Sequence, residues 1–276
     1  QSDDGEITLN ATDMINGNLH IQDPIINLDL SPQGISIKQA TARWERSLLR
    51  TTGNWLRANK RLQLDEFSIA GLEYTLPQNC KQLCLQPLPD SLAEISVGRF
   101  IANRNLIIDI NPQFPFQLTS LDGLGNNLLL ARNHQWGMWD GKLNLNASEA
   151  TFNRNDVRRP SIMLEANDRQ VTISELSAFT KEGLLEATGT VDQQPQRQFS
   201  VKVTGRAVPV NQLENWGWPH LALDGNANMQ LNLQGKMPAG VDYKPTLNGT
   251  LQVNASGGQV IDQKMVNGLV NGAATP

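Results

Sequence analysis

Two cysteines, Cys80 and Cys84, are the residues of this sequence whose type and spacing most directly suggest chemistry. They are separated by three residues and flanked by Pro77 and Pro87. This spacing suits one helical turn, which brings the two Cα atoms to a separation that a disulfide can bridge. A structural zinc site needs about four ligands, and a redox motif has two intervening residues. The pair therefore predicts a disulfide and an oxidising compartment, with two free buried thiols as the alternative.

The other potentially reactive side chains form no pattern that indicates catalysis or metal binding. His20, His134 and His220 are scattered, without the spacing of a metal-binding helix, and no nucleophile elbow, P-loop or dinucleotide fingerprint is present. Asp65 and Glu66 are adjacent, so in a strand they face opposite sides and cannot act as a glycosidase pair without distant segments. We expect no enzyme activity, no catalytic residue, no metal and no cofactor.

The aromatic composition is unusual, with six tryptophans against two tyrosines. Trp136 and Trp139 form one group, and Trp216 and Trp218 form another. These side chains suit either a sugar-stacking platform, lipid contacts, or caps on the ends of an elongated hydrophobic core. A carbohydrate-binding β-sandwich is the function that would rest on them alone.

The elements that position these residues are predicted to be β-strands. Between Leu221 and Ala255, apolar residues alternate with Asn, Gln and Thr, which is typical of strands with one dry face and one wet face. The same alternation recurs at residues 143–147 and 199–203. Further strands are predicted at Ile25–Leu30, Ile35–Ala40, Leu62–Ile69, Ile95–Ile101, Leu106–Ile110, Lys142–Ala147, Val171–Leu176, Leu184–Val191 and Phe199–Gly205.

Glycine and proline residues separate these segments, and long helical patterns are absent, which favours an antiparallel arrangement over β-α-β units. Turns are predicted at Asp122–Gly125 and Gly137–Gly141, among others, and short helices at Val210–Trp216 and Gln263–Leu269. The first of these helices follows Pro209 and offers Leu213 and Trp216 at helical spacing. Residues 40–50 fit a helix about as well as a strand. The predicted fold is all-β and mainly antiparallel, an elongated, curved and twisted sheet with an apolar concave face and a few short helices. Residues 1–276 are expected to form one β-rich region, with a sub-boundary near residues 77–90.

The composition limits the classes of partner. Charged residues make up 18% of the 276 residues and the net charge is −4, which gives no basic surface for nucleic acid. The chain has no run of about 18 apolar residues, so no segment of this sequence is predicted to span a bilayer. The sequence opens at Gln1 without a methionine, and residues 265–276 end in a Gly/Ala/Asn string, so we expect a fragment of a longer protein, either matured by processing or lacking an N-terminal anchor.

Three segments share a loose repeat, in which a strand, a slight kink and a second strand end in alanine. They are Leu62–Ala70, Ile95–Ala102 and Val171–Ala178. The third copy continues into a glycine-punctuated strand that ends at Val191, and the stretches 221–235, 247–253 and 257–262 have the same character. With these motifs, residues 160–270 resemble the AsmA family of bacterial envelope proteins, and a weaker similarity reaches back to Ile35.

The resemblance implies a periplasmic protein that is anchored to the inner membrane through an N-terminal helix absent from this sequence. Larger members of that family look like bridges that carry phospholipid along a β-sheet groove and so contribute to outer-membrane homeostasis. The implied partners are phospholipid and an outer-membrane or other envelope protein. The alternative function is a scaffold or regulator of outer-membrane protein assembly that acts through strand edges.

A sheet with one apolar face must hide that face by folding over, by receiving a second sheet or by holding lipid. Under the lipid hypothesis, the inward residues of the alternating segments face acyl chains. They are Leu143, Leu145, Val201, Val203, Met229, Leu231, Leu233, Leu251 and Val253.

The disulfide leads to a first test. Because Cys80 and Cys84 close a very short loop, loss of the bond is expected to cost less than the roughly 2–4 kcal/mol that is typical of native disulfides. Mass spectrometry of the non-reduced, alkylated protein should find no alkylation at either cysteine. Two alkylated thiols would contradict the prediction.

Overall fold

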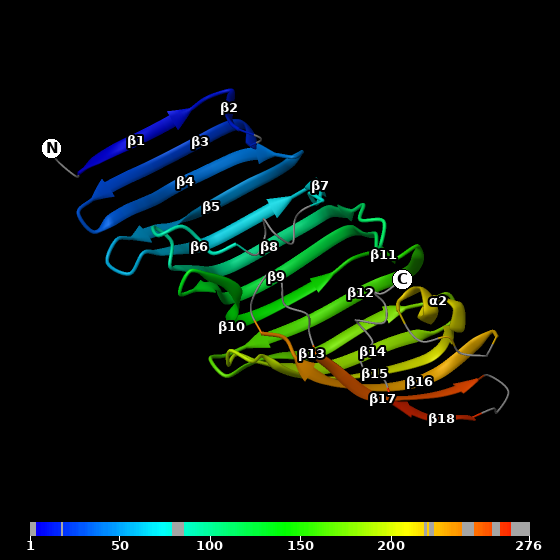
Figure 1. The fold of residues 1–276 in the computed structure, drawn as a ribbon. Helices are drawn as coiled ribbons and strands as arrows, with labels where there is room; N and C mark the ends of the chain where they lie inside the picture. The colour runs from blue at the N-terminus through cyan, green and yellow to red at the C-terminus, as the bar shows by residue number, and fades with distance from the viewer. Residues whose placement is uncertain are drawn as a thin grey trace. The chain divides into compact units, whose positions relative to one another are not determined.

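The computed structural model describes residues 4–17, 19–78, 86–217, 220, 224–238, 246–255 and 260–265. Strands make up most of this part of the chain, and their pairing is mainly antiparallel, which confirms the predicted all-β fold class (Figure 1). The chain divides into two compact units. Unit 1 comprises Gln1–Ile108 and Thr119–Leu145, and unit 2 comprises Asp109–Leu118 and Asn146–Pro276. The sub-boundary predicted near residues 77–90 falls within the range of unit 1.

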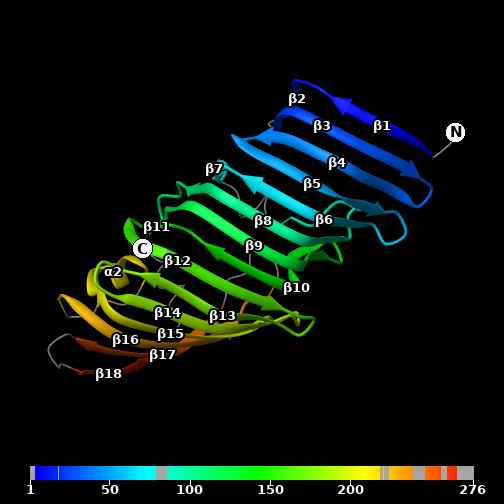
Figure 2. The ribbon, with the colours of Figure 1, turned by 180° about the vertical axis from the view of Figure 1, so that it is seen from behind.

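Unit 1 contains the first eight strands and most of the next two. They are β1 (Gly5–Asn10), β2 (Asp13–Asn16), β3 (Leu19–Ser31), β4 (Gly34–Trp44), β5 (Ser47–Leu56), β6 (Arg61–Ala70), β7 (Glu73–Thr75), β8 (Glu94–Asp109), β9 (Phe116–Arg132) and β10 (Gln135–Asn146). Strands β1 and β2 both pair with β3, and the order then follows the chain to β6 through antiparallel hairpins. The views from the two sides show β9 and β10 following β8 (Figure 2).

One pairing in unit 1 departs from the antiparallel pattern. Strands β6 and β7 both run parallel to β8, in the registers Leu64↔Val97 and Tyr74↔Ile107. Because parallel neighbours cannot be joined by a tight turn, a longer return segment, residues 76–93, separates β7 from β8 in the sequence. The Trp55 Nε1 group donates a hydrogen bond of 2.9 Å to the Ser91 carbonyl in this return segment. The predicted disulfide, Cys80–Cys84, falls in the same segment but outside the described residues.

Unit 2 is a succession of antiparallel hairpins. Its strands are β11 (Glu149–Phe152), β12 (Asn155–Ala166), β13 (Gln170–Phe179), β14 (Leu184–Asp192), β15 (Gln198–Pro209), β16 (Asn226–Lys236), β17 (Thr246–Ala255) and β18 (Val260–Met265). The helix α2 (Val210–Asn215) follows β15 directly. This helix confirms the prediction for Val210–Trp216.

Two predicted turns are wrong. The glycine-containing segments 122–125 and 137–141 lie inside β9 and β10 and are not turns. A Cβ atom at Gly123 would lie 2.9 Å from the Leu145 side chain, and one at Gly125 would lie 2.6 Å from Leu128. These glycines therefore make room for large side chains on the sheet, a role that composition alone does not distinguish from a turn.

Three further segments can be compared with the sequence prediction. Residues 40–50, which fitted a helix or a strand, form the hairpin of β4 and β5 around Glu45 and Arg46, both with positive φ, as in a type I′ turn. The strand predicted at Leu106–Ile110 is the end of the long strand β8. The helix predicted at Gln263–Leu269 is wrong for residues 263–265, which belong to β18, and its remainder lies outside the described residues.

Bulges bend several strands. Asp23 in β3, Arg159 in β12 and Ala207 in β15 have positive φ and coincide with shifts in strand register. A bulge inserts an unpaired residue and increases the local twist. These positions explain how long strands curve within each unit.

Close packing of the backbone at Gly53 in β5 leads to a stability prediction. A Cβ atom there would lie 2.3 Å from the Gln63 carbonyl oxygen of β6, whereas a Cβ at Gly5 would meet nothing within 4 Å. We expect Gly53→Ala to lower the free energy of unfolding by about 1–3 kcal/mol because the two strands must separate, and Gly5→Ala to change it by less than about 0.5 kcal/mol. Urea denaturation measures both values. Equal values for the two variants would contradict the described register of β5 and β6.

Candidate functional site

In unit 1, apolar side chains from neighbouring strands line up on one face of the sheet. Leu64 of β6 pairs with Val97 of β8, and Phe67 pairs with Phe100. The two phenylalanine rings stack with their centroids 6.1 Å apart and their planes 6° from parallel. Paired residues of adjacent strands point to the same side, so these contacts continue from strand to strand as one apolar face.

This face of unit 1 is only partly closed. Leu64, Val97 and Leu128 are buried at its centre. The apolar side chains that pack around them remain half-buried, namely Ile37, Leu62, Phe67, Phe100, Leu130, Met138 and Leu143. Leu143 and Leu145 alternate in β10 with the exposed residues Lys142 and Asn144, so the structure places both predicted residues on one face.

In unit 2, the predicted alternation of apolar and polar residues along the strands also places the apolar side chains on one face of the sheet. Between β15 and β16, Val201 pairs with Leu233 and Val203 pairs with Leu231. Between β16 and β17, Leu231 pairs with Leu251 and Met229 pairs with Val253. Between them, the polar residues of β16 are exposed on the opposite face, namely Asn228, Gln230, Asn232 and Gln234. The predicted residues of unit 2 therefore share one side of its sheet.

Burial along the face of unit 2 is graded. Met229, Leu231, Leu251 and Val253 are each less than 5% exposed, whereas Val201, Val203 and Leu233 are half-buried. The buried residues are those that share a cluster with α2. Its Leu213 side chain is fully buried in one cluster with the four buried strand residues, together with Val208, Val210 and Ala227. The face is thus closed at the end under α2 and less covered toward Val201 and Leu233.

The local sequence explains why α2 leaves the sheet at this point. The bulge at Ala207 shifts the register of β15, which pairs for only two more residues, Val208 and Pro209, before the helix begins. The Ala207 N–H donates a hydrogen bond of 3.0 Å to Asn228 Oδ1. Pro209 then precedes the first helical residue, a position that suits a residue without an N–H. After the helix, Gly217 has φ of +94° and its N–H bonds to the Glu214 carbonyl at 3.1 Å, which ends the helix.

The helix also contacts the turn between β11 and β12. Trp216 Nε1 donates a hydrogen bond of 2.7 Å to the Phe152 carbonyl, and the Trp216 ring packs against both apolar clusters of unit 2. Asn153 Nδ2 donates to the Asn215 carbonyl, and Asn215 Nδ2 donates to Asn155 Oδ1 at 3.3 Å. The last turn of α2 is therefore latched to this hairpin.

These contacts require the sheet of unit 2 to curl. Strands β12 and β17 are separated by five pairings, which would place them about 24 Å apart in a flat sheet. A six-residue helix such as α2 is only about 9 Å long. Because α2 and Trp216 reach both the β11–β12 turn and the cluster on β16 and β17, the sheet curves around them, with the apolar residues on the inner side.

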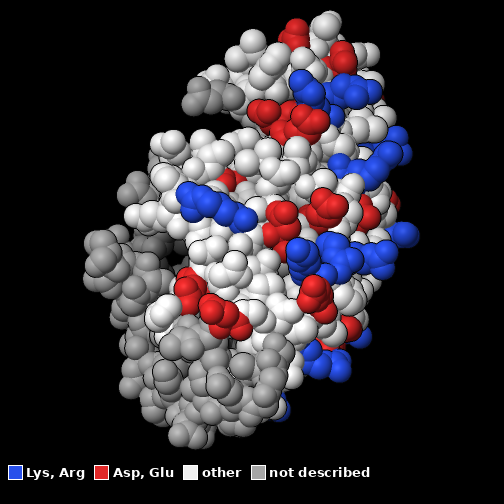
Figure 3. Space-filling model, turned by 90° about the vertical axis from the view of Figure 1, so that its right-hand side faces the viewer, with Lys and Arg blue, Asp and Glu red and all other residues white. Residues whose placement is uncertain are grey.

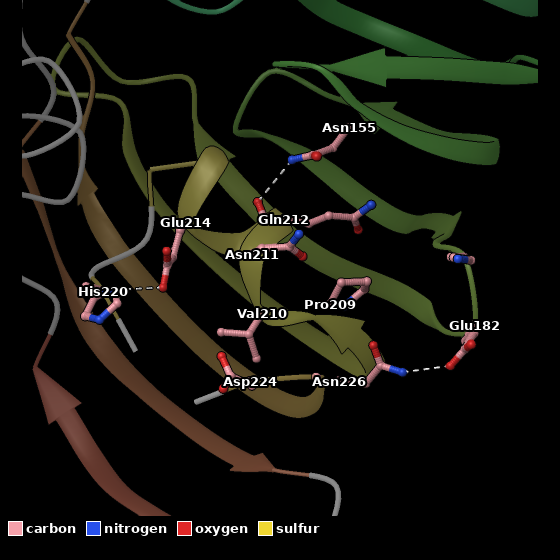
Figure 4. Close-up of a pocket in the computed structure, with 12 residues that line it drawn as sticks. Asn155, Glu182, Pro209, Val210, Asn211, Gln212, Glu214, His220, Asp224 and Asn226 are labelled. Atoms are coloured by element: carbon pink, nitrogen blue, oxygen red, sulfur yellow. Dashed lines mark hydrogen bonds and ion pairs between the residues drawn. The ribbon is translucent and has the colours of Figure 1, made fainter. Parts of the chain in front are cut away.

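A polar pocket of about 860 Å³ lies beside α2 (Figure 4). Glu214 is 3.0 Å from His220, and Asn226 donates a hydrogen bond of 2.8 Å to Glu182. Lys181 and Asp224 complete the charged lining. The described residues that line the pocket include no Ser, Thr or Cys, and the described part of the chain contains no group of three or more His, Cys, Asp or Glu that could hold a metal ion.

The other histidines and the tryptophans considered in the sequence analysis are dispersed over the described structure. His20 lies 2.9 Å from Asp13, and His134 Nδ1 lies 3.2 Å from the Pro89 carbonyl, both within unit 1. Trp139 is buried and donates to the Gln135 carbonyl at 3.1 Å, whereas Trp136 is 45% exposed. Trp139 and Trp216 thus pack into the sheets as core residues, and Trp218 lies outside the described residues.

Charges on the surface are mixed. Figure 3 shows Lys and Arg side chains interspersed with Asp and Glu, without a large area of one sign on the face in view. On β4, Lys38 lies 2.8 Å from Asp29, and this hydrogen-bonded ion pair raises the pKa of the lysine. Partial burial lowers the pKa of Arg197, in the turn between β14 and β15. Within the described residues, we find no helix with the length and hydropathy needed to cross a bilayer.

Sequence reasoning missed two contributions to the apolar faces. It identified Leu213 and Trp216 as a helical pair but did not assign them the role of covering β16 and β17. It also left out the Phe67–Phe100 stack, although the repeat aligns these residues. Leu62–Ala70 and Ile95–Ala102 are the paired strands β6 and β8, so the repeat was the signal that placed the two rings together.

Comparison with known proteins agrees with this architecture. The model of the AsmA family matches residues 116–275. The chain is also 53% identical over 271 residues to the AsmA family protein YicH of Escherichia coli strain K12, an alignment that covers 98% of this chain and 48% of YicH. The chain therefore spans about half the length of that curated relative. No solved structure matches the chain significantly.

Burial under α2 predicts a strong response to charge at one position of β16. Leu231 is 2% exposed and its neighbour Asn232 is exposed on the opposite face. We expect Leu231→Arg to lower the free energy of unfolding by about 3–5 kcal/mol because the guanidinium has no buried partner. The matched control, Asn232→Arg, should change it by less than about 0.5 kcal/mol. Urea denaturation of the two variants provides the test, and comparable losses would mean that the two faces of β16 are not distinct.

Proposed function

The chain belongs to the AsmA family of bacterial envelope proteins, and we propose that its apolar sheet faces hold the acyl chains of phospholipids as one segment of a lipid conduit. Because the chain spans about half of its curated relative, the role of the whole protein is part of the proposal. The proposed location is the periplasm, with the full protein anchored to the inner membrane and an outer-membrane or envelope protein as a further partner.

The observation that carries the proposal is the incomplete burial of aligned apolar side chains. Phe67, Phe100 and Leu130 in unit 1 and Val201 and Leu233 in unit 2 are all half-buried, although they belong to continuous apolar faces. Each CH₂ group transferred from water to such a surface contributes about 0.8 kcal/mol. An acyl chain therefore gains binding energy along the face and covers it at the same time.

The chemistry of the faces favours a hydrocarbon over a peptide or a sugar. The amides of Gln230, Asn232 and Gln234 in β16 point away from the apolar side, so this strand offers few directional contacts there. A sugar site requires exposed aromatic rings with polar groups around them, but Trp139 and Trp216 pack into the sheets. A hydrocarbon chain needs no directional partner, because hydrophobic burial is non-directional.

The test uses the half-buried residue Leu233 and its exposed neighbour Gln234 as a matched pair. A photoreactive amino acid replaces each residue in turn in the full-length protein, and cells are irradiated before purification. We expect position 233 to give an adduct with the mass of a phospholipid and position 234 to give none, because the two side chains point to opposite faces.

The same samples distinguish the scaffold function. If position 233 cross-links only to protein and the purified chain carries no extractable phospholipid, this segment does not hold lipid. Adducts between position 234 or the strand edges and another envelope protein would then favour a scaffold that acts through strand contacts.

A further inference from the structure

We propose that α2 is a displaceable plug, whose apolar side chains occupy one end of the acyl-binding face of unit 2 until an acyl chain replaces them. The inference rests on the proposed function and concerns the regulation of the same site. Lipid would then have access to two stretches of one surface, an open stretch at Val201 and Leu233 and a stretch under α2 that opens only when the helix moves.

The first argument is that the open and covered stretches form one surface. Leu231, under α2, and Leu233, which is half-buried, are separated by one residue of β16 and point to the same side. Their partners Val203 and Val201 alternate in β15 in the same way. An acyl chain at Leu233 therefore lies next to the apolar surface that α2 covers, with no polar side chain of β15 or β16 between them on that face.

The second argument is that α2 has little stability of its own. It contains six residues, and its N-cap is Pro209, whose side chain cannot make a capping hydrogen bond. Its first turn has no acidic residue and its last turn has no basic residue. Helices this short are not stable in water without tertiary contacts. The position of α2 therefore depends on what it packs against.

The third argument concerns the nature of those contacts. Val210, Leu213 and Trp216 are spaced three residues apart and present one apolar stripe to the sheet. A hydrocarbon chain can replace such a stripe because the contacts are non-directional. The latch to the β11–β12 turn consists of hydrogen bonds at partly or fully exposed positions, such as Asn153 to Asn215, which water can also satisfy.

The fourth argument is that the closed position leaves a polar group unsatisfied. The Gln212 side-chain oxygen is buried and has no hydrogen-bond partner among the described residues. Figure 4 shows Gln212 beside the polar pocket, where the Gln212 backbone carbonyl accepts a bond of 3.5 Å from Asn155. Because an unsatisfied buried acceptor is unfavourable, movement of α2 toward water relieves a cost of the closed state.

Both ends of α2 allow such a movement. Ala207, with φ of +50°, is a bulge in β15, and only the pairs Val208↔Ala227 and Pro209↔Asn226 lie between it and α2, so displacement of the helix from this point opens two pairs. Gly217, with φ of +94°, follows the helix at its other end. Rotation at these two positions displaces α2 while the ladder between β15 and β16 at residues 198–205 stays intact.

A reversible tether between α2 and the β11–β12 hairpin tests the proposal. The variant Asn155→Cys/Asn215→Cys replaces two side chains that contact each other at 3.3 Å, so that oxidation fixes the latch and reduction releases it. The probe is phosphatidylethanolamine with a diazirine in one acyl chain, presented to the purified chain in mixed micelles. After irradiation, adducts are mapped to residues by tandem mass spectrometry, and the bond is verified by mass under non-reducing conditions.

We expect adducts at Leu233 in both states, and adducts at Met229, Leu231 and Leu251 that appear under reducing conditions and fall to background after oxidation. If the adducts at these three residues do not change with oxidation, the plug is overturned. It is also overturned if these adducts never form while Leu233 is labelled. Both results leave the proposed function standing. The absence of adducts at every residue in both states overturns the proposed function and the plug with it.

Two control variants separate the effect of the tether from other effects of oxidation and from the latch itself. Asn155→Cys alone receives the same oxidant and reductant, which also act on Cys80 and Cys84, and its labelling should not depend on redox state. Asn153→Ala removes one hydrogen bond of the latch without adding a tether. Labelling at Met229 should rise about fivefold in this variant relative to Leu233, the shift expected from loss of one hydrogen bond, and an unchanged ratio counts against the plug.

Discussion

The period of two along a β-strand is the constraint on which the rest of this structure depends. Strand pairing fixes which side chains share a face, so a sequence such as 227–234 sends Met229 and Leu231 to one side and every intervening amide to the other. Repeated over neighbouring strands in register, this rule produces a wide apolar surface backed by a polar one. Such a surface must be covered, and the way in which each unit covers it distinguishes the two.

Unit 2 covers part of its surface with its own chain. β15 ends two pairs after the bulge at Ala207, and the helix that follows packs Leu213 and Trp216 against the apolar residues of the next strands. In unit 1, three buried residues are surrounded by apolar side chains that stay half-buried. The interaction that closes unit 2 is local to a single short helix, so closure of one unit implies nothing about closure of the other.

The sequence was most informative where the physical rule is local. Alternation predicted the faces of β15, β16 and β17, and proline followed by Leu213 and Trp216 at helical spacing predicted α2. Glycines were misleading, because Gly123 and Gly125 make room for side chains from other strands, which is a property of tertiary packing. The parallel pairing of β6 with β8 was also missed, since it depends on a return segment whose path is not encoded in either strand. Burial of Leu231 beneath α2 required the curl of the sheet, which arises from many pairings together.

The hairpin succession of unit 2 has a consequence for how the chain acquires its structure. From β12 to β17, each strand pairs with the one that directly precedes it in the sequence, and the described exceptions are the further pairings of β11 with β9 and of β12 with β10. Such pairings give the unit a low contact order, because paired residues are close in the sequence. Short connecting loops favour rapid folding in which one hairpin forms after another. Each completed hairpin presents an edge on which the following strand assembles, as in repeat proteins whose order propagates from neighbour to neighbour. Most of the unit can therefore assemble during synthesis without waiting for distant parts of the sequence.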